Sequence, residues 1–303
     1  MCCLFLAASS TVAIAQTNVV DLVNPIIGTN GMGHTFPGAC VPFGLVQLSP
    51  DTDTIPHNVD GKYQPRSYEY CAGYQHKDSS IVGFSHTHLS GTGHSDLGDI
   101  LIMPTTGTLK LNPGTATNPD GGYRSRFSHD TEISRPGYYE VMLADYGVKA
   151  QLTTTQRVGI HKYTYPTNIE NQRIILDMIH GIYNYDGKVL WTNIRVENDT
   201  LVTGYRITNG WARTNYTYFA MSFSKPITHY GCEEKARVNY RGGYAKFNMK
   251  ENFPDIGGRK IVAYFDFDPK TSDELEVKVA LSGVSTEGAL KNLRAEASGA
   301  DFD

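Results

Sequence analysis

Short runs of alternating apolar and polar residues fill the sequence from about Ile100 to Leu281, and Gly, Pro, Asn or Asp interrupts them. A period of two is typical of a β-strand that buries one face and exposes the other. The clearest run is Glu274 to Leu281, where Leu or Val recurs while Glu276 and Lys278 lie between them. The same pattern predicts further strands at Gly137 to Ala144, Val148 to Thr155, Gly159 to Tyr165, Arg173 to Ile179, Leu201 to Thr208, Tyr216 to Ser224 and Lys260 to Asp266.

So many strands with almost no helical periodicity predict a mainly β fold, a large antiparallel β-sandwich, rather than alternating βαβ units. Asp145 to Gly147 and Asn239 to Gly243 have the composition of hairpin turns. The pattern changes only at residues 285–297, where small and aliphatic residues fall on one helical stripe and Ser285 can serve as the N-cap. Because this stripe needs a cover, the helix either folds back on the sandwich or leads into a further domain.

Charge and length restrict the class of protein. The chain has 303 residues and a formal net charge of -4, from 27 Lys and Arg against 31 Asp and Glu. It can bury a sizeable core, and it has no general attraction for nucleic acid or an anionic membrane surface. No run approaches the roughly 18 apolar residues of a membrane span.

Residues 1–15 are apolar and uncharged and end in Ala13-Ile14-Ala15. They predict a signal peptide cleaved before Gln16, although the usual Lys or Arg at the start is missing; the alternative is a short buried apolar segment. Secretion or a bacterial periplasmic location follows. The mature chain would keep Cys40, Cys71 and Cys232, whose number and spacing fit neither a disulfide framework nor a zinc motif.

The segment Asn24 to Gly44 is too rich in Gly and Pro for a regular strand or helix. It predicts a tightly turned loop whose backbone N–H groups, with His34 as a donor and Phe36 as an apolar platform, can meet sugar hydroxyls. It lacks the spacing of a dinucleotide or P-loop motif. The alternative is a structural loop that buries Phe36 and Phe43.

The segment Gly83 to Asp99 holds His86, His88, His94, Asp96 and Asp99. His86 and His88 would lie on one side of a strand, so a divalent metal site is geometrically possible. The same groups also suit a hydroxyl-rich ligand, because each sugar hydroxyl both donates and accepts hydrogen bonds. A hydrogen-bonded scaffold loop is the third reading.

Tyr63, Tyr68, Tyr70 and Tyr74 lie between these segments and can provide aromatic walls for a pyranose ring. No acylation motif surrounds Cys71, so we do not expect a nucleophile there. Asp96 and Asp99 are the one close carboxylate pair in a plausible pocket, and two carboxylates on one short loop are not obviously placed on opposite sides of a scissile bond. The sequence therefore offers no convincing acid and base.

One set of motifs extends over nearly the whole mature chain, and its longest member is Phe-Ser-His-Thr-His-Leu-Ser-Gly-Thr-Gly. The set comprises Val23 to Thr29, His34 to Ala39, Pro42 to Gly44, Gly83 to Gly93, Gly98 to Leu101, Gly204 to Arg206, Gly210 to Ala212, Phe223 to Pro226 and Val284 to Gly288. It resembles the N-terminal domain of glycoside hydrolase family 92, the calcium-dependent exo-acting α-mannosidases.

The resemblance implies a signal peptide at 1–15, a β-sandwich domain at 16–283, and at 284–303 the start of linker helices to an (α/α)6 barrel outside this chain. In that family the general acid Glu, the general base Asp and most calcium contacts lie in the barrel, and hydrolysis inverts the anomeric centre. We therefore expect calcium to be bound mainly by the barrel, and no catalytic residue or metal ligand in these residues.

By the same resemblance, mannose-containing glycans, with α-1,2 linkages the expected type, and the barrel are the expected partners. The residues expected to line the substrate pocket are His34, Thr35, Phe36, Pro37, Gly38, Tyr70, Cys71, Tyr74, His86, His88, Asp96 and Asp99. Two other hypotheses remain open: a stand-alone carbohydrate-binding module, and a small metalloenzyme built on His86, His88 and His94.

Overall fold

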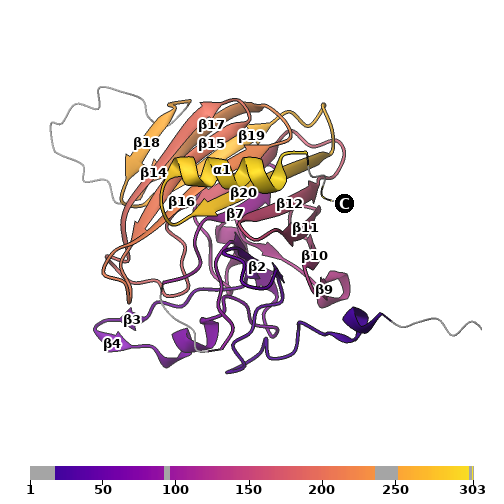
Figure 1. Cartoon of the computed structure of the whole chain (residues 1–303). Helices are drawn as coiled ribbons and strands as arrows, with labels where there is room; N and C mark the ends of the chain where they lie inside the picture. The colour runs from indigo at the N-terminus through magenta and orange to yellow at the C-terminus, as the bar shows by residue number, and fades with distance from the viewer. Residues whose placement is uncertain (1–17, 92–95, 236–251, 300–301, 303) are drawn as a thin grey trace, which may run out of the picture.

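Two large antiparallel sheets form a β-sandwich in the computed structural model, which describes residues 18–91, 96–235, 252–299 and 302 (Figure 1). The larger sheet has nine strands, in the order β18-β14-β15-β16-β20-β12-β11-β10-β9. Its strands are β9 (Ile133–Arg135), β10 (Tyr138–Leu143), β11 (Val148–Thr154), β12 (Val158–Thr164), β14 (Val189–Asn198), β15 (Leu201–Thr208), β16 (Asn215–Phe223), β18 (Asp255–Gly258) and β20 (Glu274–Ser282).

The smaller sheet has seven strands, in the order β1-β2-β6-β7-β13-β19-β17. These are β1 (Ala39–Cys40), β2 (Gln47–Asp51), β6 (Gly83–Ser85), β7 (Leu101–Thr105), β13 (Gln172–Asp177), β17 (Ile227–Glu234) and β19 (Ile261–Phe267). Strand β13 lies between β7 and β19 and is buried along its whole length. The predicted antiparallel sandwich is confirmed.

Alternation along β20 builds the core between the sheets. Leu275, Val277 and Val279 are fully buried, whereas Glu276 and Lys278 are half-buried on the opposite face. Ala280 is buried although it belongs to that opposite face, because the helix α1 (Thr286–Ala297) lies across it. Figure 1 shows this helix lying across the outer face of the nine-stranded sheet.

The helix α1 thus folds back on the sandwich, which is one of the two arrangements expected from its apolar stripe. Ala289 and Leu293 pack against Val158 and Ala280 of the sheet. The Ser285 hydroxyl accepts a hydrogen bond from the Gly288 N–H at 3.0 Å, so the predicted N-cap is confirmed. With 12 residues, α1 is too short to cross a membrane, and no other described helix is long and apolar enough to do so.

Long connections gather at one end of the sandwich, below the sheets in Figure 1. They contain the remaining short elements: η1 (Val19–Leu22), β3 (Asn58–Val59), β4 (Lys62–Tyr63), η2 (Pro65–Tyr70), β5 (Ser80–Ile81), β8 (Ser125–Arg126), η3 (Pro119–Gly121) and η4 (His129–Thr131). Strand β3 pairs with β4, and β5 pairs with β8. These connections hold most of the predicted pocket residues.

All the strands predicted by alternation are present, with ends shifted by a few residues. The hairpin turn at Asp145 to Gly147 is confirmed, because β10 and β11 pair from Leu143 opposite Val148. The predicted turn at Asn239 to Gly243 and the predicted signal peptide at 1–15 lie outside the described residues.

Candidate functional site

A buried carboxylate, Asp51 at the end of β2, joins two histidines from distant parts of the chain. Its Oδ1 atom lies 2.9 Å from His88 Nε2, and its Oδ2 atom lies 3.0 Å from His180 Nε2. The other ring nitrogen of His88 lies 2.8 Å from the Gln47 carbonyl oxygen. A carbonyl oxygen only accepts, so this Nδ1 atom donates. The three side chains therefore fix the position of the segment that follows β6.

The two histidines determine how Asp51 titrates. Complete burial acts to raise the pKa of the Asp51 carboxyl, but the charges of His88 and His180 and their hydrogen bonds outweigh it and hold the pKa well below its usual range. Gly73 lies directly against this group with φ +81, and a Cβ atom there would be 2.0 Å from Asp51 Oδ1. Only glycine fits at this position.

The predicted loop residues His34 and Phe36 lie beside this buried group. The Phe36 ring centroid is 5.4 Å from that of His88, and the His34 ring meets Tyr68 edge-on at 4.7 Å. His34 is 7 % exposed with φ 52, and its Nε2 atom has no hydrogen-bond partner among the described residues. Phe36 is half-buried. This pair thus presents one polar atom and one aromatic ring.

The rest of this loop is held by short hydrogen bonds. The Thr35 hydroxyl donates to the Ile27 carbonyl at 2.8 Å, and the Ser134 hydroxyl donates to the Pro37 carbonyl at 2.6 Å. Gly38 runs so close to β2 that a Cβ atom would be 2.1 Å from the Leu48 carbonyl oxygen. These contacts fix the backbone on both sides of His34 and Phe36.

His86 is fully buried and belongs to a different hydrogen-bond chain from His88. Its Nδ1 atom lies 2.6 Å from the Ile100 carbonyl oxygen, and its Nε2 atom lies 3.0 Å from His161 Nε2 on β12. The other His161 nitrogen lies 2.8 Å from the Tyr163 hydroxyl. Burial lowers the pKa of His86 to about 4 and that of His161 well below its usual value. Both rings are therefore neutral near pH 7.

The two predicted aspartates have separate partners. Asp96 accepts hydrogen bonds from the backbone N–H groups of Trp211 and Ala212 at 2.9 and 3.2 Å. Asp99 is buried, accepts from the Thr87 hydroxyl at 2.9 Å, and forms an ion pair with Arg206 at 3.1 Å. Asp96 therefore caps the 210–212 turn, and Asp99 neutralises a buried cation.

Arg206 and Lys188 add positive charge beneath the 96–99 segment. Arg206 is fully buried, and its Nη1 atom donates to the carbonyl oxygens of Met178 and His180. Its Nη2 atom has no hydrogen-bond partner among the described residues. Burial first, and then the charge of Arg206, lower the pKa of Lys188 to about 7.

The structure places the predicted Tyr70, Cys71 and Tyr74 inside the domain, where Tyr74 and Cys71 have no exposed surface and Tyr70 is 2 % exposed. The Tyr70 hydroxyl donates to Asp78 at 3.1 Å and the Tyr74 hydroxyl to Glu132 at 2.8 Å. Cys71 packs beside Ile182 and Tyr183. These three side chains are thus buried in the domain, and their contact with a sugar stays a prediction.

The predicted strand that would carry both histidines ends earlier, at Ser85, and His86 and His88 have different partners. The expectation that both rings lie on one side of a strand is therefore wrong. All four of their ring nitrogens already face protein groups, which leaves no site for a metal between them. His94 lies outside the described residues. Among the described residues, no disulfide involves Cys40, Cys71 or Cys232.

Sequence reasoning missed Asp51, His180 and Arg206, which complete the buried groups around His88 and Asp99. Asp51 and His180 are 129 residues apart in the sequence, so no local spacing could pair them. The one signal was Gly204 to Arg206, a motif that recurs in the resemblance but has no chemistry of its own. A hollow of about 810 Å³ is lined by Val20, Ile133 and Arg135 and by none of the predicted pocket residues.

Known proteins match the chain over most of its length. Residues 22–282 match the glycosyl hydrolase family 92 N-terminal domain. A family 92 α-mannosidase from Bacteroides thetaiotaomicron, solved in complex with mannoimidazole, is 41% identical with a TM-score of 0.80 and is matched over 92% of this chain and 34% of that chain.

More distant relatives agree. A family 92 inverting mannosidase from Bacteroides thetaiotaomicron is 26% identical with a TM-score of 0.70, over 96% of this chain and 35% of that chain. An uncharacterized secreted glycosidase from Arthroderma benhamiae is 25% identical, over 97% of this chain and 37% of its own length. The chain thus spans about a third of the length of these relatives.

Proposed function

Because the chain belongs to glycosyl hydrolase family 92, we propose that it forms the N-terminal sandwich of a secreted, exo-acting α-mannosidase. In this proposal the chain supplies one wall of the pocket that holds a terminal α-linked mannose, with α-1,2 linkages as the expected substrates. A second, (α/α)6 domain supplies the other wall and the catalytic groups.

The observation that carries this proposal is the pair His34 and Phe36. The unpartnered His34 Nε2 atom is suited to a sugar hydroxyl, which both donates and accepts. The half-buried Phe36 ring is suited to the C–H face of a pyranose. His88 supports the Phe36 ring and is itself fixed by Asp51, so the wall is rigid before a sugar arrives.

The neighbouring loop extends this wall. The Gly91 N–H donates to the His34 carbonyl at 2.7 Å, and so the 85–91 segment is joined to the 24–38 loop. Each of the two loops exposes an apolar side chain, Met32 at 62% and Leu89 at 46%. Such exposed apolar groups at a polar rim suit a surface that a second domain covers.

The carboxylates of this wall have other tasks. Asp96 caps a turn and Asp99 faces Arg206, so neither is positioned as a general acid or base. Inversion needs two carboxyl groups about 6.5 to 9.5 Å apart with a water between them. We therefore place the acid and base in the second domain.

Calcium takes six to eight oxygen ligands. The three-residue group in the described part that could hold a metal offers two imidazole nitrogens and one carboxylate. No step of the proposal is therefore assigned to calcium bound by this chain.

An assay of the purified chain with α-1,2-mannobiose and calcium tests whether the catalytic acid and base lie in the second domain. We expect no mannose release, because this chain holds the wall and not the acid and base. Release of mannose with inverted configuration by this chain alone would contradict the proposal. Calorimetry with the same mannoside distinguishes the other hypothesis, because tight binding without turnover would favour a stand-alone carbohydrate-binding module.

A further inference from the structure

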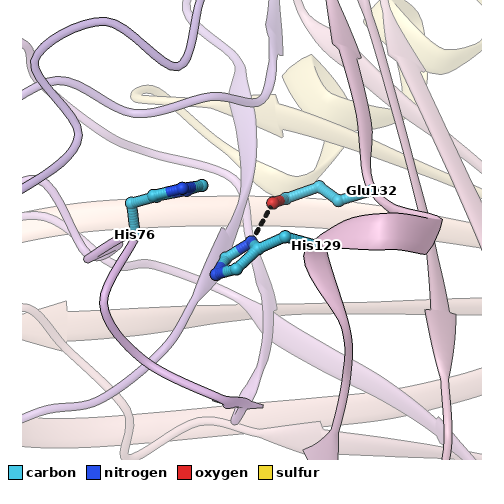
Figure 2. Close-up of side chains that lie close together, drawn as sticks. All are labelled: His76, His129 and Glu132. Atoms are coloured by element: carbon cyan, nitrogen blue, oxygen red, sulfur yellow. Dashed lines mark hydrogen bonds and ion pairs between the residues drawn. The ribbon is translucent and has the colours of Figure 1, made fainter.

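His76, His129 and Glu132 come together at the surface of the domain, and none of them is among the residues of the proposed mannose wall (Figure 2). His76 follows the η2 segment, whereas His129 begins η4 and Glu132 directly follows it. We propose that these three side chains bind a transition-metal ion of the Zn²⁺ class.

The ligand atoms are close enough for one ion. One ligand atom from each residue lies within 4.8 Å of the other two, and His129 Nδ1 is 2.6 Å from Glu132 Oε2. Ligands at about 2.0 to 2.2 Å from a tetrahedral zinc lie roughly 3.4 Å apart. The His129 to Glu132 contact must therefore open slightly while His76 moves inward. In Figure 2 the His129 and Glu132 side chains point toward one another and the His76 ring lies beside them.

Two tyrosines already orient the carboxylate as a metal site requires. Glu132 Oε1 accepts hydrogen bonds from the Tyr74 hydroxyl at 2.8 Å and from the Tyr139 hydroxyl at 2.7 Å. An ionised carboxylate only accepts, so both hydroxyls are the donors in these hydrogen bonds. Outer hydrogen bonds of this kind fix a ligand before the metal arrives.

Solvent can reach the site from the histidine side. The His129 side chain is 38% exposed, whereas that of Glu132 is only 3% exposed. The two imidazole ring centroids are 4.0 Å apart with planes inclined by 32°, so both rings lie at the same place on the surface. Two nitrogens and one carboxylate, with a fourth position open to water, suit zinc rather than calcium or magnesium.

A bound ion would tie together segments that hold the mannose wall. The His76 N–H donates to the Thr29 carbonyl at 2.8 Å, and the Gln75 side chain exchanges hydrogen bonds with the Gly31 backbone at 2.7 and 2.9 Å. The 24–38 loop is therefore attached to one ligand of the site, and η4 carries another. The ion would act as a structural clamp on that loop.

Zinc titration of the chelator-stripped, untagged chain tests the site. Exposed thiols such as Cys40 are first blocked with iodoacetamide, because they too bind zinc. A competing chromogenic chelator reports the affinity, and calcium is titrated in parallel. We expect one zinc ion to bind, the Tm to rise by a few degrees, and calcium not to compete.

Variants locate the ion. His76→Ala and His129→Ala should each weaken zinc binding by at least tenfold, and Tyr139→Phe by about 10-fold to 100-fold. His229→Ala is the matched control, because that side chain is also 38% exposed but lies on β17, and it should bind zinc as the parent does. The proposal is overturned if the parent chain shows no saturable zinc binding, if His76→Ala and His129→Ala bind zinc as tightly as the parent, or if calcium displaces the zinc.

Discussion

A buried series of hydrogen bonds runs from Tyr163 through His161 to His86 and makes the fold sensitive to acid. The Ile100 carbonyl only accepts, so His86 carries its proton on Nδ1 and accepts on Nε2. His161 must then donate through Nε2 and accept through Nδ1 from the Tyr163 hydroxyl. The position of each proton in this series of hydrogen bonds is therefore fixed. A further proton on His86 would place two N–H groups against each other, with the two Nε2 atoms 3.0 Å apart.

The sign and size of the pH effect follow from the pKa of His86. Burial, with the Ile100 hydrogen bond opposing it, lowers that pKa from 6.5 to about 4. As the pH falls below 6.5 the unfolded chain takes up a proton that the folded chain refuses, so stability is lost until the pH reaches about 4. The loss is about 3 kcal/mol at about 1.4 kcal/mol per pKa unit. His161 adds a loss of the same sign.

Urea unfolding between pH 7.5 and 4.5 measures this slope. Over this pH range the free energy of unfolding of the parent chain should fall by most of the amount given above. In the double variant His86→Leu, His161→Phe the free energy of unfolding should change much less with pH, whatever its absolute value. His229→Gln removes a surface histidine and should keep the parent slope. Parallel slopes for the parent and the double variant would refute the proton assignment.

Two further substitutions test the packing. Gly73→Ala should lower the free energy of unfolding in urea by at least about 2 kcal/mol, because φ is +81 and the new Cβ meets Asp51 Oδ1. The control Gly61→Ala, with φ +75 and no atom within 4 Å, should lose only about 1 kcal/mol from backbone strain. Equal losses in the two variants would contradict the close approach at Gly73. Leu293→Ala should lower the free energy of unfolding by about 2 kcal/mol, because Leu293 fills the contact between α1 and the nine-stranded sheet. The control Lys291→Ala, at an exposed position of the same helix, should change it by no more than about 0.5 kcal/mol. No loss in Leu293→Ala would show that the helix is not docked in solution.

Alternation in the sequence predicted β20 because that strand has one core face and one solvated face. It did not predict β14, which departs from regular register between Val189 and Trp191 and again between Val196 and Asn198. Each irregularity shifts the side-chain period, so the apolar residues no longer fall at every second position. It also missed β2, a strand of five residues in which the polar residues Ser49 and Asp51 are buried instead of facing solvent.

In the candidate site, too, the sequence predicted only what a short run of residues contains. The Gly-rich loop and the histidine segment were visible because their chemistry is concentrated in short runs. The partners that give those residues their properties come from elsewhere: Asp51 and His180 for His88, His161 for His86, and Arg206 for Asp99. Likewise His76 and Glu132 meet only after η4 lies against the segment that follows η2. Only the folded topology brings such groups together.

A chimera measures the central claim most directly. In it, this chain replaces the corresponding N-terminal third of the 41% identical α-mannosidase from Bacteroides thetaiotaomicron. The account predicts that the chimera releases mannose from α-1,2-mannobiose, that His34→Ala and Phe36→Ala in this chain each lower kcat/KM by at least about tenfold, and that His229→Ala leaves it unchanged. A folded, monodisperse chimera that releases no mannose, or one whose kcat/KM is the same in His34→Ala and Phe36→Ala, would contradict it.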